Sequence, residues 1–245
     1  MVLLVLLSHA DAFSPAVHRA LAARAVALES AAAPSRALPL LAEPLTAEIA
    51  AAFVRGAGNE DWNLPRKWLL WHHYYNPSFT VRSLWRRPSD QRVAQLDVLI
   101  QGALAEDRPG RAWLLAGLLA HHVQDMASPP HVVPVAHGLF DPFESQATAD
   151  LVPSLTGAAV PDLALPATHH ALALDTLAAL DAPLLCDGGP VALATVWAPR
   201  PGRYGRAVIP FGRDCAAGAD TFLHARLEAA LAYTRAVIRY VARMN

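Results

Sequence analysis

Residues 117–144, with the sequence GLLAHHVQDMASPPHVVPVAHGLFDPFE, decide how this chain must fold. An apolar run over residues 111–127 predicts a helix, and His121 and Asp125 lie four residues apart on one face of it. Two prolines end that helix and turn the backbone, so that His131 points back toward the same face. Imidazole and carboxylate groups are costly to bury without a neutralising cation, and both are ligands of zinc. The stretch therefore predicts a metal site on a buried helix.

The bulk composition indicates one large domain with an apolar core. Of the 245 residues, 54% are hydrophobic, and the mean hydropathy is +0.25. Much of this content is alanine and leucine, which favour helix. No apolar run reaches the roughly 18–20 residues that a transmembrane helix needs. With 20 basic and 21 acidic residues the net charge is −1, and no basic cluster indicates binding to nucleic acid or to an anionic membrane.

The first twelve residues, MVLLVLLSHADA, predict a signal peptide. Their short apolar core ends in a small-x-small pattern that suits cleavage before Phe13. A basic leader is missing, so the alternative is a first buried strand or helix. We expect residues 1–12 to be removed and residues 13–245 to form one domain that is exported to the periplasm or the extracellular space. There, Cys186 and Cys215 either pair or remain two buried thiols.

Helical periodicity recurs along the chain, and no alternating strand pattern is evident. We predict helices over residues 15–30, 46–55, 89–106, 111–127, 144–153, 168–180 and 220–243. Gly56 and Gly58 are expected to end the second of these, and Ser89 to cap the third. Residues 187–213 are rich in glycine, proline and arginine and predict a long surface loop. The fold expected is an all-α, single-domain multi-helix bundle with the metal cluster at the base of a cleft.

Cleavage before Phe13 would create a further pair of candidate ligands. The α-amine and carbonyl of Phe13 stand five residues from His18, which lies in the first turn of the next helix. A neutral amine and an imidazole together make a workable zinc site. Without cleavage at that point, His18 is a solvated histidine at the start of a helix.

Two motifs resemble those of a known family. The pattern G-x3-H-x3-D-x3-P-x-H over residues 117–131 resembles the signature of the zinc-dependent phospholipase C and single-strand-specific nuclease superfamily. The sequence HYYNP, which begins at His73, resembles a second family motif in which a loop aspartate, here Asp61, pairs with the histidine. The mature N-terminal residue of the family is typically tryptophan. Phe13 departs from this, but ligation by its backbone does not need the indole ring.

The resemblance implies a cluster of three zinc ions. The implied ligands are Asp61, His73, His121 and Asp125 for the first ion; Asp125, Phe13 and His18 for the second; and His131, His137 and an acid for the third. Asp141 keeps a four-residue spacing from His137, whereas Glu144 keeps an aromatic–Glu pairing, and we favour Glu144. His72 and His122 each adjoin an implied ligand, and we expect them to face elsewhere because a helix turns about 100° per residue.

The resemblance also implies a reaction. Zinc ions that share a water lower its pKa and direct it at a phosphodiester, and Asp61 would be the catalytic residue that orients this water or acts as base. The HYYNP context and the near-neutral charge favour phospholipase C activity on phospholipid or a related phosphate ester, with transient contact to a membrane surface. A single-strand nuclease or 3′-nucleotidase is the alternative enzyme; nucleic acid would then be the partner, and Trp62, Tyr74 or Tyr75 would stack on its bases. A third hypothesis is a non-catalytic zinc-binding protein.

Overall fold

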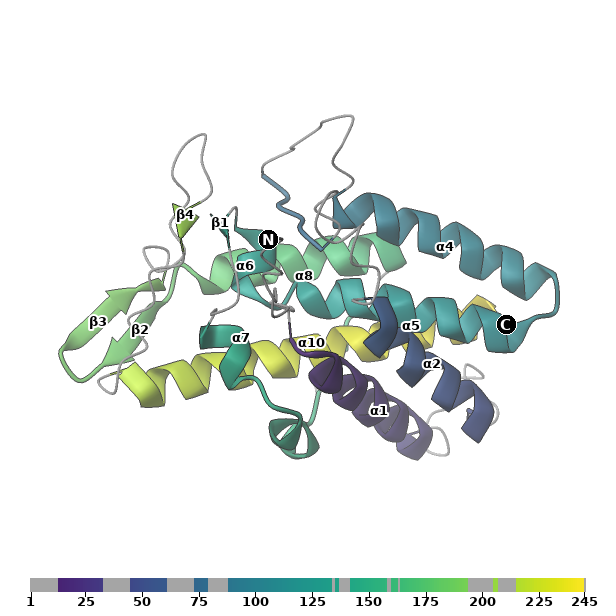
Figure 1. The fold of residues 1–245 in the computed structure, drawn as a ribbon, viewed down its shortest axis with the longest axis horizontal. Helices are drawn as coiled ribbons and strands as arrows, with labels where there is room; N and C mark the ends of the chain where they lie inside the picture. The colour runs from purple at the N-terminus through teal and green to yellow at the C-terminus, as the bar shows by residue number, and fades with distance from the viewer. Residues whose placement is uncertain are drawn as a thin grey trace, which may run out of the picture.

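Helices dominate the computed structural model of the chain (Figure 1). It describes residues 13–32, 45–60, 73–78, 88–133, 135–136, 142–157, 160–162, 164–193, 205–206 and 215–244. The helices are α1 (Pro15–Ala32), α2 (Ala47–Asn59), α4 (Ser89–Ala105), α5 (Pro109–Asp125), α6 (Pro129–Val132), α7 (Pro142–Gln146), the 3-10 helix η4 (Ala149–Ser154), α8 (Leu165–Ala179) and α10 (Ala216–Met244). The all-α prediction is confirmed.

Two small pairs of strands accompany the helices. β1 (Val135–Ala136) pairs in parallel with β4 (Gly205–Arg206), and β2 (Pro183–Cys186) pairs antiparallel with β3 (Gly189–Ala192). The hairpin turns at Asp-Gly, a dipeptide typical of tight two-residue hairpin loops. The prediction of a surface loop over residues 187–213 was therefore wrong at two places. Residues 189–192 form a strand that pairs with the apolar segment before the turn, and residues 205–206 form a strand that pairs with β1.

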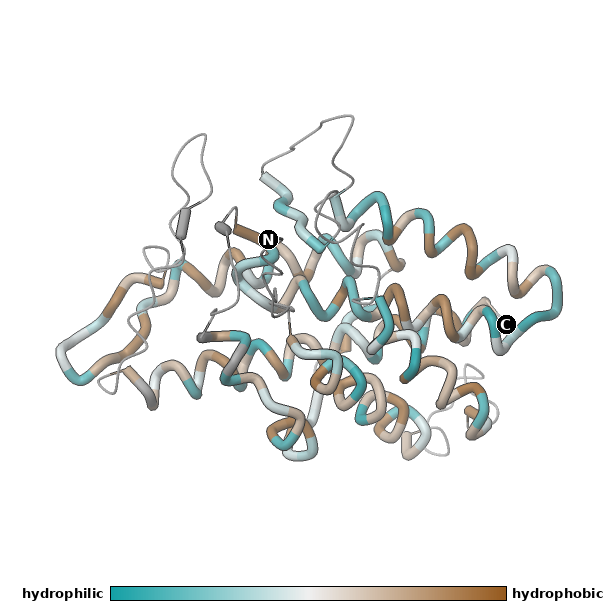
Figure 2. Tube along the Cα trace, in the orientation of Figure 1, coloured by the Kyte–Doolittle hydropathy of each residue, from teal (hydrophilic) through white to brown (hydrophobic). Residues whose placement is uncertain are grey.

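Helix α5 lies at the centre of the bundle and packs against α2, α4 and α10. Apolar and hydrophilic residues recur along each of these helices (Figure 2), which is the pattern of helices that cover a shared core. The exception is the last turn of α5, where every residue from His121 to Asp125 is buried. Burial of this polar turn places its imidazole and carboxylate groups inside the protein.

Several predicted helix boundaries differ in the structure; α8 and α10, for example, each begin three or four residues earlier than expected. Gly56 and Gly58 do not end α2, which continues to Asn59; Gly56 lies instead at a close crossing with α5, where a Cβ would be 2.2 Å from the carbonyl oxygen of Leu114. Ser89 is the first residue of α4 and does not cap it; its hydroxyl contacts two buried histidines. The helix expected over residues 144–153 is divided into α7 and η4.

A disulfide between Cys186 and Cys215 joins the β2–β3 hairpin to the start of α10. Gly218 of α10 lies against strand β2, and a Cβ added to it would be 2.3 Å from the carbonyl oxygen of Leu185. The hairpin therefore rests directly on the backbone of α10.

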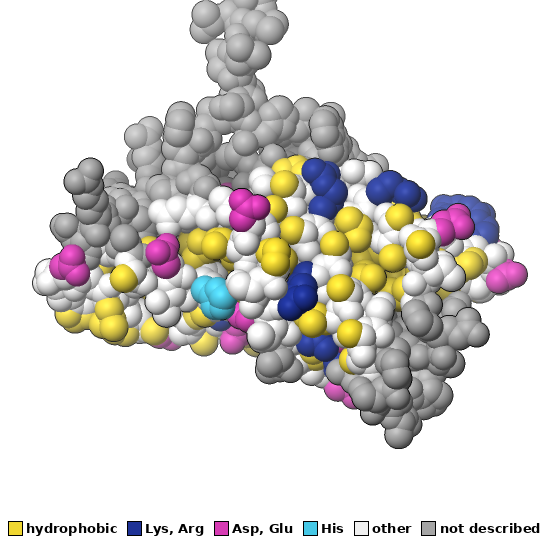
Figure 3. All heavy atoms as spheres, turned by 90° about the horizontal axis from the view of Figure 1, so that it is seen from below, with side chains coloured by type: hydrophobic (Ala, Val, Ile, Leu, Met, Phe, Trp, Pro, Cys, Tyr) yellow, Lys and Arg dark blue, Asp and Glu magenta, His cyan; other side chains and the backbone are white. Residues whose placement is uncertain are grey.

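The surface of the described residues carries charges of both signs. On the face shown in Figure 3, acidic and basic side chains are interspersed with apolar ones. Large exposed hydrophobic residues include Val98, Leu151, Leu174 and Leu185. None of the described helices is both long enough and apolar enough to cross a membrane. The predicted signal peptide, residues 1–12, lies outside the described residues.

Candidate metal centre

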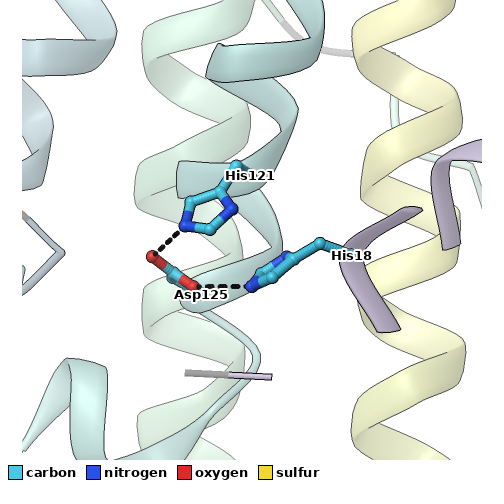
Figure 4. Close-up of side chains that lie close together, drawn as sticks. All are labelled: His18, His121 and Asp125. Carbon is cyan, nitrogen blue, oxygen red and sulfur yellow. Dashed lines mark ion pairs between the residues drawn. The ribbon is translucent and has the colours of Figure 1, made fainter. Parts of the chain in front are cut away.

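Asp125, the last residue of α5, lies among three buried histidines. Its Oδ1 is 3.4 Å from His18 Nε2, and its Oδ2 is 2.6 Å from His73 Nδ1 and 3.5 Å from His121 Nε2. Figure 4 shows His18 and His121 reaching the two carboxylate oxygens from α1 and α5. Oδ1 of Asp125 therefore faces one imidazole, and Oδ2 faces two.

Backbone carbonyl groups orient two of the histidines near this carboxylate. His121 Nδ1 donates to the carbonyl oxygen of Ala57, at 2.9 Å, and His131 Nδ1 donates to that of His73, at 2.7 Å. A carbonyl oxygen only accepts, so Nδ1 carries the proton in both rings and Nε2 is the atom that faces a carboxylate. Metal-binding histidines use this arrangement to fix the tautomer and the plane of the ring.

A second imidazole–carboxylate pair adjoins the first. His131 Nε2 lies 3.2 Å from Glu144 Oε1, which also accepts a hydrogen bond of 2.9 Å from Ser128 Oγ. The short helix α6 that begins at the two prolines carries His131 to this position, and the amide of Tyr75 donates to the His131 carbonyl. Burial lowers the pKa of His131, but the nearby carboxylates, Asp125 first, outweigh it and raise the pKa to about 9.

The donor set fits zinc. One ligand atom each from His18, His121 and Asp125 lie within 4.8 Å of one another, and the same holds for His73, His122 and Asp125. Ligands about 2.0–2.1 Å from a tetrahedral zinc stand roughly 3.3–3.5 Å apart. The separations of 3.4 Å and 3.5 Å between the two carboxylate oxygens and His18 and His121 match that spacing. Nitrogen and carboxylate oxygen are also the ligand types that zinc accepts.

His122 lies beside the cluster, yet both its ring nitrogens contact other groups. Nε2 is 3.2 Å from Glu60 Oε1 and Nδ1 is 3.1 Å from Ser89 Oγ, although the ring centroid lies 5.0 Å from that of His73. Arg92 also donates two hydrogen bonds to Glu60. Burial would raise the pKa of Glu60, but His122 and Arg92 outweigh it and hold the pKa far below its ordinary range.

The network that holds His122 reaches helix α8. Ser89 Oγ lies 3.0 Å from His169 Nε2, and burial together with the charges of His122 and His170 lowers the pKa of His169 to about 3. Tyr75 lies against the His169 ring, and its hydroxyl is 2.7 Å from His170 Nδ1. Neither Ser89 nor His169 was predicted to belong to the site. Their hydrogen bonds join segments far apart in the chain, for which local spacing carries no signal.

The structure brings seven of the ten predicted ligand residues into one region: Phe13, His18, His73, His121, Asp125, His131 and Glu144. The buried Phe13 ring lies 6.0 Å from the His18 ring and 6.3 Å from the Phe143 ring, between centroids. The other three, Asp61, His137 and Asp141, lie outside the described residues, as does Trp62. The metal-binding roles of all ten residues remain predictions.

Comparison with known proteins finds a solved structure with a similar fold. No family model matches the sequence, and no curated protein matches it. Among solved structures, the α-toxin of Clostridium perfringens, from an avian strain, matches with a TM-score of 0.66 over 96% of this chain, at 14% sequence identity. This chain spans 65% of the length of the α-toxin chain. The protein thus has a fold like that of part of the α-toxin, and its buried histidine–aspartate cluster could hold a metal ion.

Proposed function

We propose that this protein is a zinc-dependent phosphodiesterase that hydrolyses phosphate esters of phospholipids, with phospholipase C activity. The observation that carries the proposal is the position of Asp125. One of its oxygens faces His18 and the other faces His73 and His121, so this one carboxylate could contribute a ligand atom to each of two cations. The α-toxin-like fold also supports the proposal, as do the sequence motifs around His73 and His121, which resemble those of the zinc-dependent phospholipase C and nuclease superfamily.

The residues that would hold the ions follow from this arrangement. His73, His121 and Asp125 would hold one ion together with Asp61. His18 and Asp125 would hold a second, with the backbone of Phe13 as a further ligand if the chain is cleaved there. His131 and Glu144 would hold a third with His137. When bound, zinc ions lower the pKa of a shared water and polarise a phosphoryl oxygen.

The side chains of this protein would set the geometry for that reaction. The hydrogen bonds of His121 and His131 to backbone carbonyls hold each imidazole plane in place before a ligand arrives. Preorganised ligands bind without reorganising, and a site that excludes water strengthens their interaction with charge. Asp61 would orient the attacking water or remove its proton, and the apolar residues around the cluster would keep other water away.

A proton occupies part of the same site in the zinc-free protein. Asp125 and Glu144 raise the pKa of His131 to about 9, so its imidazole is protonated at neutral pH when no cation is bound. Zinc would replace that proton, and zinc binding would release it to the solvent. We therefore expect zinc affinity to increase as the pH rises from neutral to about 9.

The proposal is tested by zinc analysis and turnover of the Asp125→Asn variant. The wild-type protein should bind two or three zinc ions and hydrolyse a phosphatidylcholine analogue, and Asp125→Asn should lose zinc and several orders of magnitude in turnover. Asp181→Asn, at an exposed position after α8, is the matched control and should behave as wild type. Near-normal turnover in Asp125→Asn would remove the metal-cluster mechanism.

Substrate class is decided in the same assay. Turnover of single-stranded DNA or of a 3′-nucleotide, without turnover of the lipid analogue, would establish the nuclease alternative with the same ions. Full zinc occupancy without turnover of any phosphodiester would identify a non-catalytic zinc-binding protein.

A further inference from the structure

A buried chain of hydrogen bonds connects the candidate zinc ligand His18 to helix α10. His18 Nδ1 lies 2.6 Å from Gln124 Oε1, and Gln124 Nε2 donates to Thr234 Oγ1 at 3.0 Å. Thr234 Oγ1 donates to the carbonyl oxygen of Ala230 at 2.7 Å. The side chains of His18, Gln124 and Thr234 are fully buried. Three helices, α1, α5 and α10, are linked by this one chain.

The direction of every bond in this chain follows from its last acceptor. The Ala230 carbonyl can only accept, so the single hydroxyl proton of Thr234 is committed to it. Thr234 Oγ1 must then accept from the amide NH2 of Gln124, which turns the amide oxygen toward His18. A reversed amide would set two acceptors against each other at Thr234. Only a protonated Nδ1 on His18 can donate to that oxygen.

This direction determines which nitrogen of His18 faces the metal centre. With its proton on Nδ1, the neutral ring presents the lone pair of Nε2, which lies 3.4 Å from Asp125 Oδ1. Gln124 and Asp125 are consecutive residues of α5, so one turn of helix holds both nitrogens of the same imidazole. A neutral Nε2 aimed beside a carboxylate is the form in which histidine binds zinc.

We propose that Gln124 and Thr234 are positioning residues that fix His18 as the Nδ1–H tautomer and aim its Nε2 at the cation site beside Asp125. The inference rests on the proposed function. In His121 and His131 a backbone carbonyl holds a proton on Nδ1, and no substitution removes such a carbonyl directly. The tautomer of His18 depends on side chains, so it can be changed by mutation without touching a ligand.

The experiment compares Gln124→Met and Thr234→Val with matched controls. Gln124→Met keeps the length of the side chain and removes its hydrogen bonds, and Thr234→Val keeps the shape and removes the hydroxyl. Thr221→Val is the control on the same helix, because Thr221 Oγ1 donates to the Ala217 carbonyl at an exposed position. Gln91→Met is the exposed glutamine control on α4. Thr234→Ser restores the hydroxyl and serves as the rescue.

Two readouts separate positioning from a packing effect. The imidazole nitrogen NMR shifts of zinc-free protein report the tautomer of His18, and competition with a chromophoric chelator reports the affinity of each zinc ion. Wild type should show His18 with the proton on Nδ1, and Gln124→Met should lose this preference. One zinc ion should bind roughly 10–100-fold more weakly in Gln124→Met, with a smaller loss in Thr234→Val. Thr234→Ser and both controls should match wild type.

The outcomes distinguish this inference from the proposed function. Unchanged His18 tautomer and unchanged zinc affinity in both Gln124→Met and Thr234→Val would overturn the inference and leave a zinc enzyme in place. A wild-type protein that binds no zinc, but whose His18 tautomer changes in Gln124→Met, would overturn the proposed function while confirming the hydrogen-bond control. Equal weakening of all zinc ions would show a general structural defect and would also overturn the inference.

Discussion

Gly117 of α5 lies so close to Gly56 of α2 that neither position has room for a side chain. A Cβ at Gly117 would be 2.1 Å from the carbonyl oxygen of Phe53 and 2.8 Å from the Cα of Gly56. One residue further along α2, the carbonyl of Ala57 accepts the hydrogen bond that orients His121. The close crossing of the two helices is therefore what brings a backbone acceptor to the metal centre.

We expect Gly117→Ala to lower the free energy of unfolding by about 1–3 kcal/mol, because the added methyl group forces α2 and α5 apart. The same change should weaken zinc binding by moving the acceptor away from His121. Gly102→Ala is the control: it lies in α4 with nothing within 4 Å of the added Cβ, and alanine is favoured over glycine in a helix by about 1 kcal/mol. Urea unfolding measures the free energy of unfolding of both variants. Equal stability of Gly117→Ala and Gly102→Ala would contradict the close contact between α2 and α5.

Glu144→Gln should remove one zinc ion and leave the centre around Asp125 loaded. The amide keeps the shape of the side chain but carries no charge, so His131 loses its carboxylate partner, which lies 3.2 Å away. Glu106→Gln, at an exposed helix end, is the matched control. Zinc content by elemental analysis is the measurement. Full zinc content in Glu144→Gln and a reduced content in Asp141→Asn would assign the role to the other acid.

Stability in acid should depend on Glu29, a buried residue far from the metal centre. Burial raises the pKa of Glu29, but hydrogen bonds to Arg239 and Arg235 and their charges outweigh it and lower the pKa below 4.5. The ionised form therefore stabilises the fold above pH 4.5, and this stabilisation is lost as the pH falls through the lowered pKa.

The test is the pH dependence of unfolding in Glu29→Gln. We expect this variant to lose about 3–5 kcal/mol near neutral pH, because two arginines then lose their buried partner. Its stability should also fall less steeply than that of wild type below pH 4.5. The control Glu48→Gln lies at an exposed position in the first turn of α2. Parallel pH profiles for wild type and Glu29→Gln would rule out this ion-pair network as a source of acid sensitivity.

Reduction of the Cys186–Cys215 disulfide should destabilise the protein without removing metal. The bond closes a loop with a sequence separation of 29, and a loop of this size restricts the unfolded chain enough to stabilise the fold by about 3–4 kcal/mol. The double serine variant should show this loss and no response to reductant. Zinc content should stay unchanged, because the disulfide joins the hairpin to the start of α10 and neither cysteine is among the candidate ligands. A loss of zinc on reduction would connect the hairpin to the metal centre.

The site residues that could be predicted from the sequence are those whose positions depend on their spacing from nearby residues. His121 and Asp125 share a helix face because they are four residues apart, and the proline pair after them carries His131 to the same region. Pro15 likewise begins α1, which places His18 in its first turn. Each of these positions is fixed by residues within one or two helical turns.

The features that could not be predicted from the sequence depend on contacts between segments that are far apart in the chain. Gly56 has the local character of a helix stop, and it lies inside α2 because α5 packs against it. Ser89 has the local character of a helix cap, and its hydroxyl contacts histidines of α5 and α8. In the sequence, Gln124 is an ordinary polar residue next to a candidate ligand. Its role depends on contacts with His18 of α1 and Thr234 of α10, which only the folded structure brings together.

The adjacency of Gln124 and Asp125 has a consequence for how the chain can change in length. Insertion or deletion of a single residue between positions 121 and 125 rotates the end of α5 by about 100° relative to its beginning, which would separate His18 from both of its partners at once. The turn of the β2–β3 hairpin, at exposed residues 187–188, carries no such constraint and should accept added residues. A tag or reporter domain therefore belongs in that hairpin, and length variation among natural relatives should be found there and not in the last turn of α5.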